Sequence, residues 1–197
     1  MVIAGMCFMG CNTSKQTIET ETEEVTEIVA VTEIEEVTEI EETETETEEP
    51  SILEQLGVEV PDLGLDWSDL EKQNEHIYAW IHIPNTKVDY PILQHPTETD
   101  YYLERNLDHS KGLPGCIYTQ NMNAQDFSDA NTVIYGHNMK NGTMFKGLHK
   151  FSEDAFFNEN RYFYIYTPEK TLVYEIYAAI QFTNEHIMYK YDFDTEG

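Results

Sequence analysis

Basic residues are scarce in this chain of 197 residues, which has 11 Lys and Arg against 38 Asp and Glu and a formal net charge of −27. The deficit is not confined to one acidic segment, because residues 50–197 alone contain 23 acidic and 10 basic residues. Binding to nucleic-acid phosphates or to anionic lipid depends on clustered Lys and Arg. The composition therefore argues against nucleic acid as a partner, and a membrane location would have to come from an anchor.

Cysteine is also rare, and the three that occur, Cys7, Cys11 and Cys116, cannot all pair. A disulfide between Cys116 and either of the others would have to close across a long low-complexity segment, which disulfide geometry disfavours. We interpret Cys116 as a small, half-buried residue at the start of a strand over 116–119. The alternative, that it is a substitute nucleophile beside His137, is less favoured.

No apolar run is long enough to span a bilayer, since the N-terminal one covers only residues 1–10. It ends at Cys11, which is followed by Asn-Thr-Ser-Lys, and this arrangement resembles the end of a bacterial lipoprotein signal. The resemblance implies that Cys11 is lipidated. Phe8 and Met9 depart from the usual residues and no Lys or Arg precedes the run, so an upstream start codon or the tail of an ordinary membrane anchor stays open. Residues 1–11 are predicted as a signal, lipoprotein-like or membrane-anchor segment.

Residues 12–50 lack the pattern of a folded core. Positions 17–49 contain fifteen Glu and no Lys or Arg, and Glu-Glu-Val-Thr-Glu-Ile occurs at 23–28 and again at 35–40. The apolar residues recur near every third position, a period that would wind them around a helix rather than gather them on one face. Like charges and β-branched residues weaken a helix further. We predict an extended, self-repelling acidic linker, with a fluctuating helix as the alternative.

Residues 51–197 have the patterning of one mainly β domain with short helices. Alternating apolar residues over 77–83 predict a two-sided strand, and Asp66 or Ser68 can cap a helix that runs to about residue 73. Further strands are expected at 88–93, 132–135, 162–166 and 172–182, and further short helices at 143–150 and 152–158, the second capped by Ser152. This order favours a barrel-like β fold with an N-terminal helix.

One histidine, His137, has the setting of a catalytic residue. It follows the apolar run 132–135 and lies in a glycine-flanked stretch, Tyr-Gly-His-Asn, where we expect a loop that leaves its ring open to a substrate. An imidazole exchanges protons near neutrality, which suits general acid and base catalysis. Taken by itself, this motif is also compatible with a non-catalytic loop histidine that is hydrogen-bonded to the backbone.

The sequence around His137 resembles the class B sortases, the cysteine transpeptidases that attach proteins to Gram-positive cell walls. The resemblance is carried, in the family's order and spacing, by residues 78–94, 100–103, 115–118 and 131–145, and it continues through 156–157, 164–168 and 174–177. It implies a sortase β-barrel on the extracytoplasmic face of the cell membrane. It also implies that His137 is catalytic and that the substrates are secreted proteins with an Asn-Pro-x-Thr-like sorting signal, joined to a cell-wall or pilin amine.

The family's nucleophile lies in a later Thr-Leu-x-Thr-Cys strand that is followed by an arginine, and this sequence contains neither. We therefore interpret residues 51–197 as a class B sortase catalytic domain truncated at its C-terminus, lacking its closing strands and nucleophile and inactive by itself. Its sheet is expected to have an open edge. The alternative is a catalytically inactive surface lipoprotein or peptide-binding module derived from a sortase.

Signals for cofactors are missing. The histidines other than His137 show no pair three or four residues apart and no cysteine neighbours, which argues against a zinc site, although a site built from distant residues stays open. No phosphate-cradling glycine loop occurs. We expect no metal and no cofactor.

Overall fold

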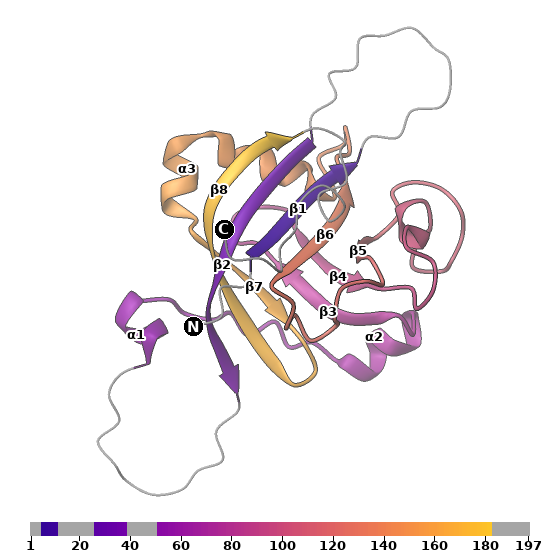
Figure 1. Cartoon of the computed structure of the whole chain (residues 1–197), viewed down its shortest axis with the longest axis horizontal. Coiled ribbons are helices and arrows are strands. Elements are labelled where there is room, and N and C mark those ends of the chain that lie inside the picture. Colours follow the sequence, from indigo (N-terminus) through magenta and orange to yellow (C-terminus); the bar gives the residue numbers. More distant parts are fainter. Residues whose placement is uncertain (1–4, 12–25, 39–50, 183–197) are drawn as a thin grey trace, which may run out of the picture.

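The computed structural model describes residues 5–11, 26–38 and 51–182 and shows a closed β-barrel with short helices around it (Figure 1). The strand order around the barrel is β1-β2-β8-β7-β3-β4-β5-β6. Neighbours pair antiparallel except β1 with β6 and β4 with β5, which are parallel. The strands are β1 (Gly5–Cys11), β2 (Thr26–Thr38), β3 (Ile77–His82), β4 (Asp89–Leu93), β5 (Ile117–Thr119), β6 (Asn131–His137), β7 (Tyr162–Tyr166) and β8 (Lys170–Phe182). The helices are α1 (Ile52–Leu56), α2 (Trp67–Gln73), η1 (Tyr101–Leu103), η2 (Phe145–Ser152) and α3 (Asp154–Glu159).

Local capping chemistry sets the two helices that precede β3. Ser51 and Glu54 form a reciprocal capping box at the start of α1, and Gly57 ends that helix in the left-handed conformation. Asp66 caps α2 by accepting a hydrogen bond from the Asp69 amide, as the sequence predicted. The helix predicted ahead of the strand at 77–83 is therefore confirmed.

The core lies inside the barrel and follows the alternation seen in the sequence. On β3, Ala79 and Ile81 are fully buried, while their neighbours along the strand are only partly so. Phe163 on β7 stacks on Tyr174 on β8, with ring centroids 5.1 Å apart. Such cross-strand aromatic pairs fix the register of the β7–β8 hairpin, because a slip by one residue would turn both rings to the opposite face.

The segment after His137 differs in helix type from the prediction. The helix expected at 143–150 is a 3-10 helix, η2, and α3 begins at Asp154 with Glu153 at its N-cap. Ser152 does not cap α3, because its hydroxyl donates to the carbonyl of His149 instead. Serine hydroxyls commonly bond a backbone carbonyl three residues earlier, and that bond competes with the capping role.

Two strands come from the N-terminal part of the chain, where none was predicted, and they close the sheet that was expected to have an open edge. Residues 26–38 of the expected linker are extended, as predicted, but they form β2 and pair along β8. β1 takes up residues 5–11 and lies between β2 and β6 (Figure 1). Thr, Val and Ile have high strand propensity, and pairing satisfies the backbone groups that an isolated spacer would leave to water. The division into anchor, linker and catalytic domain stays a prediction.

Deleting residues 1–50 should leave β3 to β8 as a six-stranded open sheet whose edges are β6 and β8. Unpaired backbone groups along two such edges are a template for association with other chains. We expect residues 51–197 to form soluble oligomers in size-exclusion chromatography with light scattering, under conditions in which the full chain is monomeric. A monomeric 51–197 with sharp cooperative unfolding would contradict this, since it would show that the six strands close their own core.

Candidate functional site

The candidate catalytic residue His137 is the last residue of β6, a strand in which every residue is buried. Gly136 makes this packing feasible, because a Cβ there would lie 2.4 Å from the Cδ1 atom of Ile117 and 2.8 Å from the Cδ2 atom of Phe145. His137 itself is only 4% exposed. The expectation of an open loop imidazole was therefore wrong: the backbone of residue 137 pairs in the sheet, and the ring is held within the fold.

The imidazole of His137 is oriented by the backbone of η1. Its Nε2 atom lies 2.6 Å from the carbonyl oxygen of Leu103. A carbonyl oxygen only accepts hydrogen bonds, so Nε2 carries a proton and donates a hydrogen bond to the Leu103 carbonyl. In the neutral ring Nδ1 is then the basic nitrogen, and in the protonated ring the Leu103 carbonyl faces one of the two N–H groups.

Two contacts hold η1 in the position that this bond requires. The amide of Cys116 donates to the carbonyl of Tyr102 at 3.0 Å. Gly115 packs so closely on η1 that a Cβ atom at this position would lie 2.5 Å from the Leu103 carbonyl oxygen. Gly115 has φ of +67°, a conformation that glycine adopts readily. Gly115 and Cys116, which lead into the short strand β5, therefore fix the position of the Leu103 carbonyl that orients His137.

Cys116 is an inert thiol in this arrangement. It is 5% exposed, and its sulfur donates to the carbonyl of Arg105 at 3.3 Å. Burial, assisted by the negative charge of Asp108, raises the pKa of Cys116 to about 12. Only the thiolate is a strong nucleophile, so this residue is unsuited to partner His137. The interpretation of Cys116 as a strand-start packing residue is confirmed, although it is more fully buried than expected.

Alkylation should distinguish Cys116 from a reactive cysteine. Because its pKa is raised, we expect Cys116 to stay unmodified by iodoacetamide at pH 7.5 in the folded chain and to react fully in 6 M guanidinium chloride. Peptide mass spectrometry measures both. Rapid modification of Cys116 in the folded chain would restore it as a nucleophile candidate, and so would a Cys116→Ala variant that folds but has lost activity.

The register of β1 places Cys11 opposite His137. The parallel ladder between β1 and β6 pairs Gly10 with Gly136 and Cys11 with His137. Neighbouring strands lie about 4.8 Å apart, so the two backbone positions are adjacent. Sequence reasoning did not find this proximity, because it depends on a long-range strand pairing. The role of Cys11 as a lipid anchor stays a prediction.

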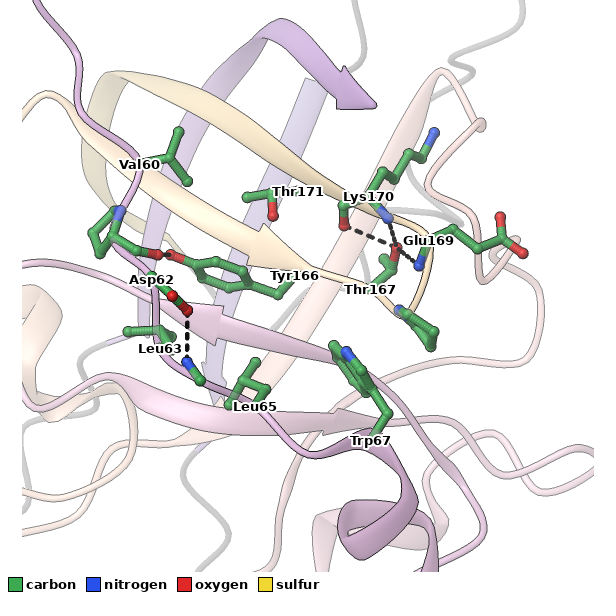
Figure 2. A pocket seen from close by; sticks show the side chains of 13 residues that line it. Val60, Asp62, Leu63, Leu65, Trp67, Tyr166, Thr167, Glu169, Lys170 and Thr171 are labelled. Carbon is green, nitrogen blue, oxygen red and sulfur yellow. Dashed lines mark hydrogen bonds between the residues drawn. The ribbon is translucent and has the colours of Figure 1, made fainter. Parts of the chain in front are cut away.

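Two of the pockets on the described surface are lined in part by strand residues. A largely apolar one of about 500 Å³ is bounded by β4, β5 and the segment 106–116, and it includes Cys116, Gly115 and Met144. The other, of about 430 Å³, lies between the arm that precedes α2 and the β7–β8 hairpin (Figure 2). Trp67, Leu65 and Tyr166 line it, with Glu169 and Lys170 at the hairpin. The first pocket reaches Gly115 and Cys116, and a third pocket, of about 560 Å³, is lined by Leu103 itself together with other residues around η1.

Sequence reasoning also missed a group of histidines around η1. His76, His95 and His109 are far apart in the sequence, but ring centroid distances of 5.0 and 6.1 Å join His76 to the other two. Among residues 5–11, 26–38 and 51–182, no group of three or more His, Cys, Asp or Glu side chains is arranged to hold a metal ion. Within the same part of the chain, no helix is both long and apolar enough to cross a membrane.

The fold and the histidine at the end of β6 define a sortase-type β-barrel, and comparison with known proteins agrees. Residues 81–195 match the sortase domain family, so the chain belongs to this family. The curated proteins it matches include the sortase B of Listeria monocytogenes, which is 38% identical over 117 residues, 59% of this chain and 47% of that protein.

Solved structures of class B sortases share the fold. Sortase B from Clostridium perfringens is 34% identical with a TM-score of 0.52, and the match covers 56% of this chain and 59% of that one. A Bacillus anthracis protein similar to sortase B is 33% identical with a TM-score of 0.53, covering 57% of this chain and 52% of that one. The chain spans about half the length of the curated relatives that it matches. Membership of the class B sortases and a mainly β sortase fold with short helices are thus confirmed.

Proposed function

We propose that this protein is a cysteine transpeptidase of the cell surface and that His137 is its catalytic imidazole. The observation that supports this best is the fixed geometry of His137 at the end of β6, with Nε2 held by the Leu103 carbonyl within the region that matches the sortase family. A buried, oriented imidazole is the group that a thiol-dependent acyl transfer requires.

The proposed reaction has two halves. A cysteine thiolate attacks the carbonyl carbon of the Thr in an Asn-Pro-x-Thr-like sorting signal, and the amine of the broken peptide bond leaves with a proton from His137. The neutral imidazole then takes a proton from a cell-wall or pilin amine as that amine attacks the thioester. An amide forms, the thiolate is released, and His137 is protonated again. No metal or cofactor takes part.

The source of the thiolate is a separate proposal. The family resemblance puts it on a later Thr-Leu-x-Thr-Cys strand, which this sequence does not contain. The pairing of Cys11 with His137 favours Cys11 as a second candidate. An irreversible peptide-based thiol trap followed by peptide mass spectrometry separates the two, because the modified peptide identifies the cysteine. Cys116→Ala is the control, since its thiol is buried.

The proposed location is the extracytoplasmic face of the membrane, with Cys11 lipidated and secreted proteins as substrates. Metabolic labelling with an alkyne fatty acid is expected to mark the protein at Cys11, and Cys11→Ser should release it into the medium. Membrane retention of unlabelled Cys11→Ser would instead show that another anchor holds the protein. A thiol trap on Cys11 and a lipid on Cys11 exclude each other, so the two experiments also check one another.

A peptide assay tests the proposed function directly. The protein expressed from the complete reading frame is incubated with a fluorescent Asn-Pro-x-Thr peptide and an amine acceptor, and the product is analysed by mass spectrometry. The proposal predicts a threonyl amide of the acceptor. Tight peptide binding without cleavage would contradict it and would support the alternative, a sortase-derived binding module.

A further inference from the structure

Three histidines gather around two tyrosines of η1, outside the proposed catalytic chemistry. His95 stacks on Tyr101 with ring centroids 4.2 Å apart, and His76 meets His95 edge-on at 5.0 Å. His109 lies 6.1 Å from both His76 and Tyr101 and 6.4 Å from Tyr102. We call these five residues the histidine cluster. It joins the start of β3, the loop after β4, η1 and the loop after η1.

Two hydrogen bonds in the cluster depend on the neutral form of His95. The Nδ1 atom of His95 accepts from the backbone amides of Thr97 and Glu98, at 3.3 and 2.9 Å. An imidazolium has no acceptor nitrogen, so protonation of His95 at Nδ1 would break both bonds. Neutral His95 is therefore part of what shapes the loop that leads into η1.

His76 is tied to η1 through a buried tyrosine. The Tyr102 hydroxyl donates to the Oδ1 atom of Asn74 at 2.9 Å, so it accepts from Nδ1 of His76 at 2.7 Å. Asn74 in turn donates to the Leu107 carbonyl at 2.8 Å, beyond η1. Tyr102 is fully buried and belongs to η1, so this network joins His76 to η1 inside the fold.

The charges that face the cluster would not neutralise three imidazolium groups. Glu75 approaches His109 at 3.6 Å and His76 at 4.0 Å, and Glu98 approaches His95 at 3.9 Å. Both carboxylates are about two-thirds exposed, at 67% and 65%, so solvent screens their attraction.

Other ionisable groups around the cluster add positive charge or do not titrate near neutrality. The guanidinium of Arg105 lies over the Tyr101 ring, 4.7 Å from its centroid. The backbone of Lys111 forms an isolated antiparallel β-bridge with the backbone of Arg105. Asp108 bonds to Ser110, which lowers its pKa, so it is ionised throughout the range of histidine titration. Burial raises the pKa values of Tyr102 and Cys116, and both stay neutral there.

The cluster is one residue from the carbonyl that orients His137, because Tyr101 and Tyr102 are followed directly by Leu103. We propose that the histidine cluster is a pH-responsive clasp, which when neutral holds η1 against His137 and when protonated releases η1 and the loop 95–112. The clasp is independent of which cysteine is the nucleophile and of whether the protein is an enzyme.

The direction of the effect follows from the environment of His76. Its pKa is lowered by burial, raised less by Glu75, and lowered further by the proximity of His95 and His109. A lowered pKa means that the folded state prefers neutral His76 more strongly than the unfolded state does. The stabilisation is complete above the ordinary histidine pKa near 6.5 and is lost as the pH falls below it.

Hydrogen exchange tests the clasp in the full chain. Exchange is followed by mass spectrometry at pH 7.5 and pH 5.0, with labelling times scaled for the intrinsic exchange rate. Peptides from 95–112 are expected to lose protection at pH 5.0 relative to pH 7.5. Unchanged protection of 95–112 would overturn the proposal.

Variants separate the clasp from general acid sensitivity. The triple variant His76→Gln/His95→Gln/His109→Gln should remove the pH dependence of 95–112. His149→Gln should keep it, although burial also lowers the pKa of His149 in η2. Equal effects of the two variants would count against the clasp.

If the triple variant does not fold, NMR of the histidine rings in the unmodified chain tests the proposal instead. In the unmodified chain, the ring signals of the cluster should titrate with the same midpoint as the amide signal of Leu103. A Leu103 amide that does not respond while the rings titrate would overturn the proposal.

Discussion

In the protein expressed from the complete reading frame, replacement of His137 by Ala or by Gln is expected to lower transpeptidation of a sorting-signal peptide by a factor of about 10²–10⁴, the usual contribution of a general acid and base. The two variants differ in stability. Ala removes a buried ring and leaves the Leu103 carbonyl without its donor, whereas the amide of Gln can still donate to that carbonyl. The rate loss should be similar in both, because neither side chain can exchange the proton.

Steady-state kinetics and urea unfolding together check this expectation. A loss of rate in His137→Gln with a nearly unchanged unfolding midpoint would assign the effect to chemistry and not to folding. His149→Ala is the matched control, a partly buried histidine in η2 that is expected to keep full activity. Turnover retained in both His137 variants would refute the catalytic role.

Replacement of Gly115 by Ala is expected to be among the most destabilising single changes in the chain. The new Cβ would lie 2.5 Å from the carbonyl oxygen of Leu103 and 2.8 Å from that of Tyr102, and both are backbone atoms that cannot swing away. A left-handed conformation costs a non-glycine residue about 1–2 kcal/mol, and overpacking adds about 1–3 kcal/mol. Because the clash displaces the Leu103 carbonyl, which accepts the hydrogen bond from His137, activity should fall together with stability.

Gly57 offers a matched control for the Gly115 prediction. It has the same φ of +67°, but a Cβ there would meet nothing within 4 Å. Gly57→Ala therefore reports the backbone strain alone, and the difference between the two variants in urea unfolding isolates the clash with η1. Equal losses of stability in the two variants would show that Leu103 yields without cost and that its carbonyl is not held firmly against His137.

Local sequence signals were sufficient wherever the deciding interactions are short in range. The cap at Asp66, the alternation along β3 and the apolar run that leads to His137 all reappear as elements in the structure. They could be predicted because a helix cap or a two-sided strand depends on residues a few positions apart. The family motifs around His137 likewise indicate the sortase fold, because they are recognisable from residue types and spacing alone.

The errors fell where a polar group has competing partners, whether these are distant in the chain or near. His137 was expected in an open loop, but its backbone pairs in β6 and its ring is held by Leu103, 34 positions earlier in the chain. Ser152 was expected to cap a helix, but its hydroxyl bonds to His149. In each case a polar group had more than one acceptor or donor within reach, and the local sequence does not say which one the fold brings closer.

The sequence by itself determined the sortase family, the mainly β fold and the identity of His137 as the candidate catalytic residue, because each depends on residue types in a fixed order. Only the tertiary structure decided that β1 and β2 lie between β6 and β8, that Cys116 is an inert buried thiol, and that His76, His95 and His109 gather around η1. These features come from pairing and packing between residues tens of positions apart. Their energies depend on the burial and distances that the closed barrel creates, which no local pattern of residues specifies.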